Sequence, residues 1–123
     1  MLKGYRDLIV WQKSMTLAEH VYRATNEFPK PEIYGLTSQM RRAVVSIASN
    51  IAEGQGRNTT GEFIQFLGIA KGSVAELETQ LELACRLTFL LSEEKELLLA
   101  QANEIGRMLA GLIAKLRTLP TNH

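Results

Sequence analysis

The sequence has 123 residues, of which 46% are hydrophobic and 22% are charged, and its formal net charge is +1. This length suits one domain, spanning residues 1–123, with a hydrophobic core that needs no metal or disulfide crosslink. The balance of 14 Lys and Arg against 13 Asp and Glu argues against a strongly basic, non-specific nucleic-acid binder, but it is compatible with a local basic patch.

The first predicted helix covers about residues 7–27 and ends before Pro29 and Pro31. Asp7 is its expected N-cap residue. Apolar residues recur at spacings of three and four, which is the period of an amphipathic helix. They form a main stripe and a second stripe beside it: Leu8, Trp11, Met15, Ala18 and Tyr22, then Val10, Leu17 and Val21.

The second predicted helix covers about 37–54, starting at Thr37 or Ser38, and the third covers about 60–91. Thr59 and Glu62 have the spacing of a capping box at the start of the third helix. Each helix carries an apolar stripe at helical spacing. The stripes are Met40, Val44, Ile47 and Ile51 in the second, and Phe63, Leu67, Ala70, Val74, Leu77, Leu81, Ala84, Thr88 and Leu91 in the third.

The fourth predicted helix covers about 93–118, with Ser92 as its expected N-cap residue. Glutamates fill its first turn, where carboxylates complement the helix dipole. Its apolar stripe is Leu98, Ala102, Ile105, Leu109, Leu112, Leu116 and Leu119. Because the connections between the four helices are short, we predict an all-α, antiparallel, up-down-up-down four-helix bundle.

Two glycines, Gly68 and Gly72, lie four residues apart inside the third predicted helix. Each costs about 1 kcal/mol relative to alanine in a helix interior, so some other interaction should offset that cost. Close approach of the second helix, which is rich in serine and alanine, is the favoured explanation. A ligand site is the alternative.

Polar residues of the second and third helices form a candidate network between them: Ser46, Asn50, Glu53, Ser73 and Glu76. Such a network can fix the register of two helices. The alternative is a nucleic-acid or anion contact, or a polar subunit interface, with nearby arginines at its centre. The candidate nucleic-acid contacts are Arg41, Arg42, Arg57, Lys13 and Lys71.

Catalytic, metal and cofactor sites are not expected. The histidines are His20 and His123, and neither has a glutamate three residues before it, as a di-iron bundle requires. His20 is interpreted as a surface or interface residue. The lone cysteine, Cys85, is interpreted as a packing residue, and a single thiol suits a reducing compartment. No signal peptide or membrane span is evident, so a cytoplasmic protein is expected.

Several long motifs occur in order in the region from Leu8 to Leu91, at residues 10–13, 28–29 with Glu32, 34–43, 46–54, 66–73 and 76–81. In these motifs the chain resembles the four-helix bundle proteins encoded in intervening sequences of bacterial 23S ribosomal RNA genes, also called the S23 family. The resemblance implies a ring-like homo-oligomer, a pentamer, whose molecular function is largely unassigned. The accessory variability protein of diversity-generating retroelements is a relative with a similar bundle, and it binds nucleic acid and a reverse transcriptase through a basic surface.

Two functions follow as expectations. The first is a non-enzymatic oligomeric scaffold that contacts RNA or an RNA-processing partner. The second is a nucleic-acid-binding accessory protein, which requires exposed arginines and binding that weakens with salt. For the scaffold, apolar residues off the main stripes are candidates for contacts with neighbouring subunits, unless they only widen the core: Ile9, Ile64, Ile69, Leu83, Phe89 and Leu99.

Overall fold

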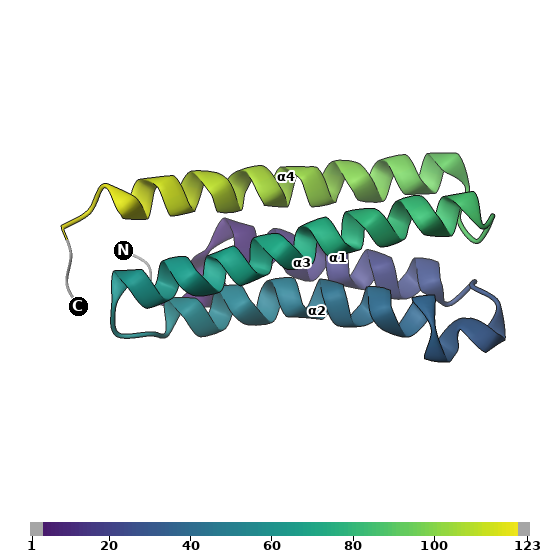
Figure 1. Cartoon of the computed structure of the whole chain (residues 1–123), viewed down its shortest axis with the longest axis horizontal. Helices are drawn as coiled ribbons and strands as arrows, with labels where there is room; N and C mark the ends of the chain where they lie inside the picture. The colour runs from purple at the N-terminus through teal and green to yellow at the C-terminus, as the bar shows by residue number, and fades with distance from the viewer. Residues whose placement is uncertain (1–3, 121–123) are drawn as a thin grey trace.

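The structure is a computed structural model that describes residues 4–120. This part of the chain forms four antiparallel α-helices joined by short connections (Figure 1), without a strand, as predicted for an up-down-up-down bundle. The helices are α1 (Ile9–Thr25), α2 (Leu36–Gln55), α3 (Thr60–Arg86) and α4 (Ser92–Arg117). Two 3₁₀ turns, η1 (Tyr5–Asp7) and η2 (Lys30–Tyr34), precede α1 and α2.

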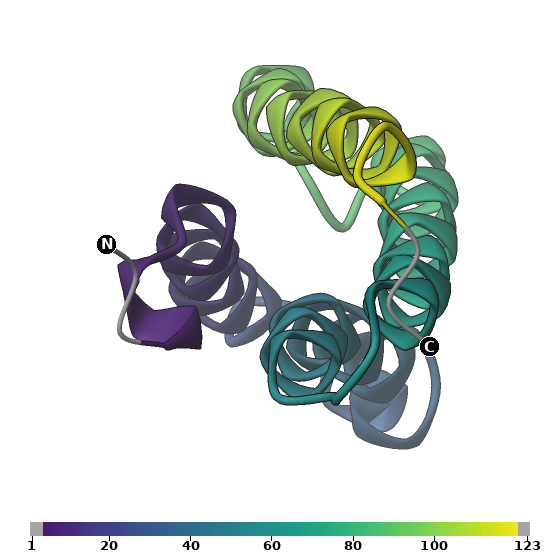
Figure 2. The same ribbon diagram turned by 90° about the vertical axis from the view of Figure 1, so that its left-hand side faces the viewer.

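The four helices stand at four corners, in chain order, when the bundle is viewed along its axis (Figure 2). The interface between α2 and α3 is the most extensive, and the one between α1 and α4 is the least extensive of the four helix pairs in contact. The predicted stripes of α2 and of the middle of α3 are buried. Their fully buried large side chains are Met40, Val44, Ile47, Ile51, Leu67, Leu77 and Leu81.

The wide apolar face predicted for α1 is only partly buried. Val10, Leu17 and Val21 are buried, and Leu8, Trp11 and Ala18 pack against the core, whereas Met15 and Tyr22 are exposed. Small polar residues occupy the remaining core positions. The Ser14 hydroxyl donates to the Val10 carbonyl at 2.7 Å, and the Thr25 hydroxyl donates to the Val21 carbonyl at 2.8 Å. These local bonds satisfy the buried hydroxyls, so the core stripe of α1 does not read as continuous apolar sequence.

The third helix is shorter than predicted and ends at Arg86 rather than near residue 91. Thr88 adopts the left-handed conformation, with φ of 65°. The amide of Phe89 donates to the Ala84 carbonyl at 2.9 Å and that of Thr88 to the Cys85 carbonyl at 3.0 Å, which is the Schellman pattern. Because glycine usually occupies this position, a helix end at a threonine could not be predicted from residue type.

Helix starts were predicted with mixed success. Thr59 caps α3 as expected, with its hydroxyl oxygen accepting from the Glu62 amide at 3.1 Å. Asp7 and Ser92 are not the N-cap residues, since Leu8 and Leu91 occupy those positions. At α4, the Glu94 carboxylate accepts a hydrogen bond from the Leu91 amide at 3.1 Å. A side chain of the first turn therefore pairs with the backbone N–H of the N-cap residue.

The prediction that Gly68 and Gly72 let α2 approach closely was also wrong. Both face outward, and a Cβ atom built on either would meet nothing within 4 Å. Close approach depends instead on Gly54 of α2, where a Cβ atom would lie 2.7 Å from Phe66 Cβ and 3.1 Å from Phe63 Cδ1. The two helices are therefore in close contact as predicted, but the glycine that permits this contact lies on α2 and not on α3.

We predict that Gly54→Ala destabilises the fold by about 1–3 kcal/mol, because the added methyl group overpacks against α3. The control is Gly111→Ala, an exposed site in α4 where an added Cβ meets nothing within 4 Å. We expect this control to be neutral or stabilising by up to about 1 kcal/mol. Urea unfolding followed by circular dichroism, at matched protein concentrations, measures both changes. Equal stability of the two variants would contradict the close approach.

Candidate functional site

A short chain of hydrogen bonds joins α2 and α3 near their centres. The hydroxyl groups of Ser46 and Ser73 lie 2.9 Å apart, one on each helix. The Asn50 side-chain amide donates to the Ser46 carbonyl at 2.8 Å and to its hydroxyl oxygen at 3.0 Å. Three of the five predicted network residues therefore meet, and they link the two most closely packed helices.

The two glutamates of the predicted network lie outside this chain of bonds. Glu53 pairs with Arg57 at 2.9 Å on the surface. Glu76 is exposed, and within residues 4–120 no hydrogen bond or ion pair joins it to the serines or to Asn50. A buried polar residue was missed instead. Gln80 is almost fully buried, and its Oε1 has no hydrogen-bond partner within the described part of the chain.

Arg41 pins the start of α2 to the end of α1. Its Nε donates to the Thr25 hydroxyl at 2.9 Å, and its Nη2 donates to the Asn26 side chain at 2.9 Å and to the Tyr22 carbonyl at 3.3 Å. The guanidinium also lies over the Tyr22 ring, 4.6 Å from its centroid. Several planar, directed contacts of this kind are typical of a structural arginine.

Arg42, the next residue, has a different environment. It is exposed, and no ion pair or hydrogen bond is formed to its side chain by residues 4–120. It lies between two grooves of about 510 and 450 Å³ that run along either side of α2. Burial of Arg42 against Glu53 or Glu76 would have argued against the nucleic-acid hypothesis. Arg42 is instead exposed and forms no ion pair with either glutamate.

The other candidate cations are dispersed. Arg57 follows the C-terminal end of α2, where it pairs with Glu53 and lies 4.7 Å from the Phe66 ring centroid. Lys71 is exposed on α3, beside a groove shared with α4. Arg41 and the last residue of α2, Gln55, are 14 residues apart, which is roughly 21 Å along the helix, and Arg57 lies beyond that end. The candidate contacts therefore do not form one compact basic patch.

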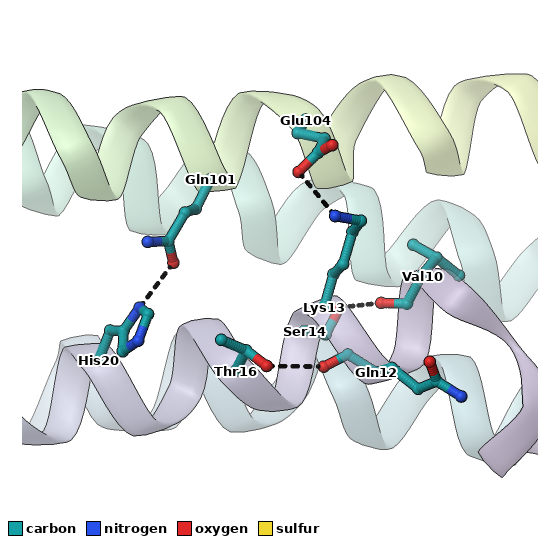
Figure 3. Close-up of polar contacts among 8 residues, drawn as sticks. All are labelled: Val10, Gln12, Lys13, Ser14, Thr16, His20, Gln101 and Glu104. Atoms are coloured by element: carbon teal, nitrogen blue, oxygen red, sulfur yellow. Dashed lines mark hydrogen bonds and ion pairs between the residues drawn. The ribbon is translucent and has the colours of Figure 1, made fainter.

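Polar contacts also bridge α1 and α4, the pair with the smallest interface (Figure 3). Lys13 Nζ lies 3.4 Å from Glu104 Oε1, and His20 Nδ1 lies 3.0 Å from Gln101 Oε1. Lys13 thus contributes to the bundle rather than extending freely from it. His20 occupies a helix–helix interface, which agrees with its interpretation from sequence.

Within residues 4–120, no group of three or more His, Cys, Asp and Glu side chains is placed to hold a metal ion. No helix in that range has the length and apolar character to cross a membrane. Lys95 has a raised pKa, mainly through its hydrogen bond with Glu96. Its half-buried side chain lies near the start of α4, with Nζ 3.1 Å from Glu96 and 3.7 Å from Glu82.

The family described as 23S rRNA-intervening sequence protein matches residues 6–111, which is most of the chain. The chain belongs to this family. The match includes α1, α2 and α3 and most of α4, so the family relationship covers nearly all of the bundle.

A solved structure supports the same assignment. It is the crystal structure of a protein of unknown function from the S23 ribosomal protein family of Bacteroides thetaiotaomicron. The two chains are 27% identical, with a TM-score of 0.78, and the match covers 85% of this chain and 98% of the other. No curated protein matches the sequence. The family resemblance and the bundle predicted from sequence are both confirmed.

We predict that Arg41→Lys lowers the free energy of unfolding by about 1–2 kcal/mol, because a lysine cannot reproduce the forked contacts with the end of α1. Its neighbour offers a matched control. Arg42→Lys should change stability by less than about 0.5 kcal/mol, as expected for a surface substitution. Denaturant unfolding of both variants tests this. Equal effects of the two substitutions would mean that Arg41 is not a structural pin.

Proposed function

We propose that the protein is a non-catalytic scaffold that works as a homo-oligomer. The observation that carries the proposal is the outward flank of α3. Gly68 and Gly72 face solvent with no atom near enough to contact an added Cβ. Each costs about 1 kcal/mol in a helix, and packing within the chain does not offset that cost. Close approach of a helix from another copy would do so.

Exposed apolar side chains accompany these glycines. Ile69 lies between them in sequence and is 48% exposed, and Leu83 is 45% exposed further along α3. On α1, Ile9 is 56% exposed. Three of the six candidate subunit-contact residues thus remain available for a neighbour. The other three, Ile64, Phe89 and Leu99, pack against the core and widen it. Exposed apolar groups beside small residues favour association of helices rather than catalysis.

A ring of copies, with five members as the family resemblance implies, is the assembly we propose. In a ring, each copy uses two different surfaces to contact its two neighbours. Such a particle would present several identical surfaces to an RNA or to an RNA-processing protein. Its role would then be to gather partners rather than to transform them.

The alternative function, a nucleic-acid-binding accessory protein, has weaker support. Arg41, Arg57 and Lys13 already have partners within the chain. Arg42 and Lys71 are the candidates that remain exposed and unpaired within residues 4–120. This alternative would be favoured if labelled RNA or DNA bound with an affinity that falls steeply with salt and that drops in an Arg42→Ala variant.

We predict that light scattering coupled to gel filtration gives a mass several times the 13.7 kDa of one chain. Gly72→Leu should reduce this mass, because a large side chain separates the helices. The variant should stay folded, since nothing lies within 4 Å of the site. Gly111→Leu is the control, at an outward position near the far end of α4 with the same free space. A monomeric wild-type protein would refute the proposal.

A further inference from the structure

Two exposed surfaces at one end of the bundle differ in charge. The first, called the α2 face, combines a turn and the N-terminal half of α2: Ile33, Tyr34, Arg42 and Val45. The second, called the α4 face, lies around the first turns of α4: Leu91, Glu93, Glu96 and Leu97. Each mixes apolar and charged side chains, and together they are complementary.

The α2 face is aromatic and positively charged. Tyr34 is 94% exposed, and Ile33 and Val45 are also exposed. Arg42 stands between them without an intrachain partner in the described range. Glu76 lies in the adjoining groove, so the face carries local charges of both signs, with Arg41 and Arg42 in excess. Tyrosine and arginine are the residue types most enriched where proteins bind one another.

The α4 face is apolar and negatively charged. Leu91 is 70% exposed and Leu97 is 67% exposed. Glutamates in a first helical turn have an ordinary explanation, since they stabilise the N-terminal end of the helix. That explanation does not account for the two leucines beside them. Lys95 forms an ion pair with Glu96 at 3.1 Å, and Arg23 of α1 lines the hollow beside Leu97. Glu93 is therefore the carboxylate of this face that has no intrachain ion pair within residues 4–120.

The position of the two faces suits a ring. The η2 turn before α2 and the connection before α4 lie at the same end of the bundle (Figure 1). α2 and α4 occupy diagonally opposite corners (Figure 2) and do not contact each other. Copies arranged side by side around a common axis would therefore bring the α2 face of one copy to the α4 face of the next, at the same height.

Pairing through a two-fold axis fits these faces less well. A two-fold interface uses the same patch on both copies. It would place Arg42 near the Arg42 of the second copy, or Glu93 near its Glu93, and like charges in an interface are unfavourable. The charge pattern thus favours contact between two different faces.

We propose that the α2 face of one copy docks on the α4 face of a second copy, with Arg42 opposite Glu93, and Tyr34 opposite Leu91 and Leu97. This proposal rests on the oligomeric scaffold proposed above. It adds a second contact between copies, at the end of α4 opposite to the segment that lies beside Gly68 and Gly72 of α3. It is independent of how many copies close the ring.

Charge reversal tests the pairing. Arg42→Glu and Glu93→Arg, each alone, should raise the protein concentration of half-dissociation by about tenfold or more, measured by sedimentation velocity. The double variant carries both reversals in every chain, so it should recover most of the wild-type association. Tyr34→Ser should also weaken association, and its folding should be unaffected because the ring is already solvent-exposed in the single chain.

Matched controls separate this proposal from the scaffold itself. Arg107→Glu and Glu19→Arg reverse the same charges at exposed positions outside both faces, and they should leave association unchanged. A wild-type monomer would overturn both proposals. A wild-type oligomer whose association responds equally to test and control variants would overturn only the docking proposal, as would a double variant that fails to recover.

Discussion

The packing of α2 against α3 supports the rest of the bundle. The two helices share the largest interface, with fully buried Ile47 and Ile51 on α2 and Leu77 and Leu81 on α3. Gly54 lets α2 approach Phe63 and Phe66 at one end, and the Ser46–Ser73 bond links the helices near the middle. Burial of large aliphatic side chains supplies most of the stabilising free energy, and the polar bond fixes their register.

The outer helices depend on this pair. α1 contacts α2, and α4 contacts α3, while the direct contact between α1 and α4 is the smallest and includes the surface pair Lys13–Glu104. Arg41 then ties the end of α1 to α2 through directed hydrogen bonds. The outward sides of the four helices take no part in this core packing. Exposed glycines, leucines and a tyrosine occur on those sides, and our functional proposals rest on them.

Much of the fold was predictable because helical periodicity is a strong signal in long segments. The stripe of α2 and the middle of the α3 stripe matched the buried core. The failures have local causes. Ser14 and Thr25 interrupt the apolar stripe of α1, and Thr88 ends α3 in a conformation that usually requires glycine. Periodicity identifies the residues that share a face of one helix. It does not identify which residues of two different helices contact each other.

Because periodicity does not show how two helices face each other, only part of the candidate site was predicted correctly. Ser46 and Asn50 were placed together correctly, because residues four apart share a helix face. Glu53 and Arg57 obey the same spacing, yet they pair with each other on the surface rather than joining the serines. Arg41 and Arg42 are adjacent in sequence, but one is a structural pin and the other is free within the described residues. Only the relative rotation of the helices distinguishes them, and sequence periodicity does not specify it.

Native-state hydrogen exchange tests the central role of the α2–α3 pair most directly. Amides protected by the most stable packing exchange only through the largest unfolding events. Our account predicts that the slowest amides lie in the middle of α2 and α3, around Ile47 and Leu77, and that those of α1 exchange sooner. Slowest exchange in α1 or α4, with α2 and α3 opening first, would contradict it.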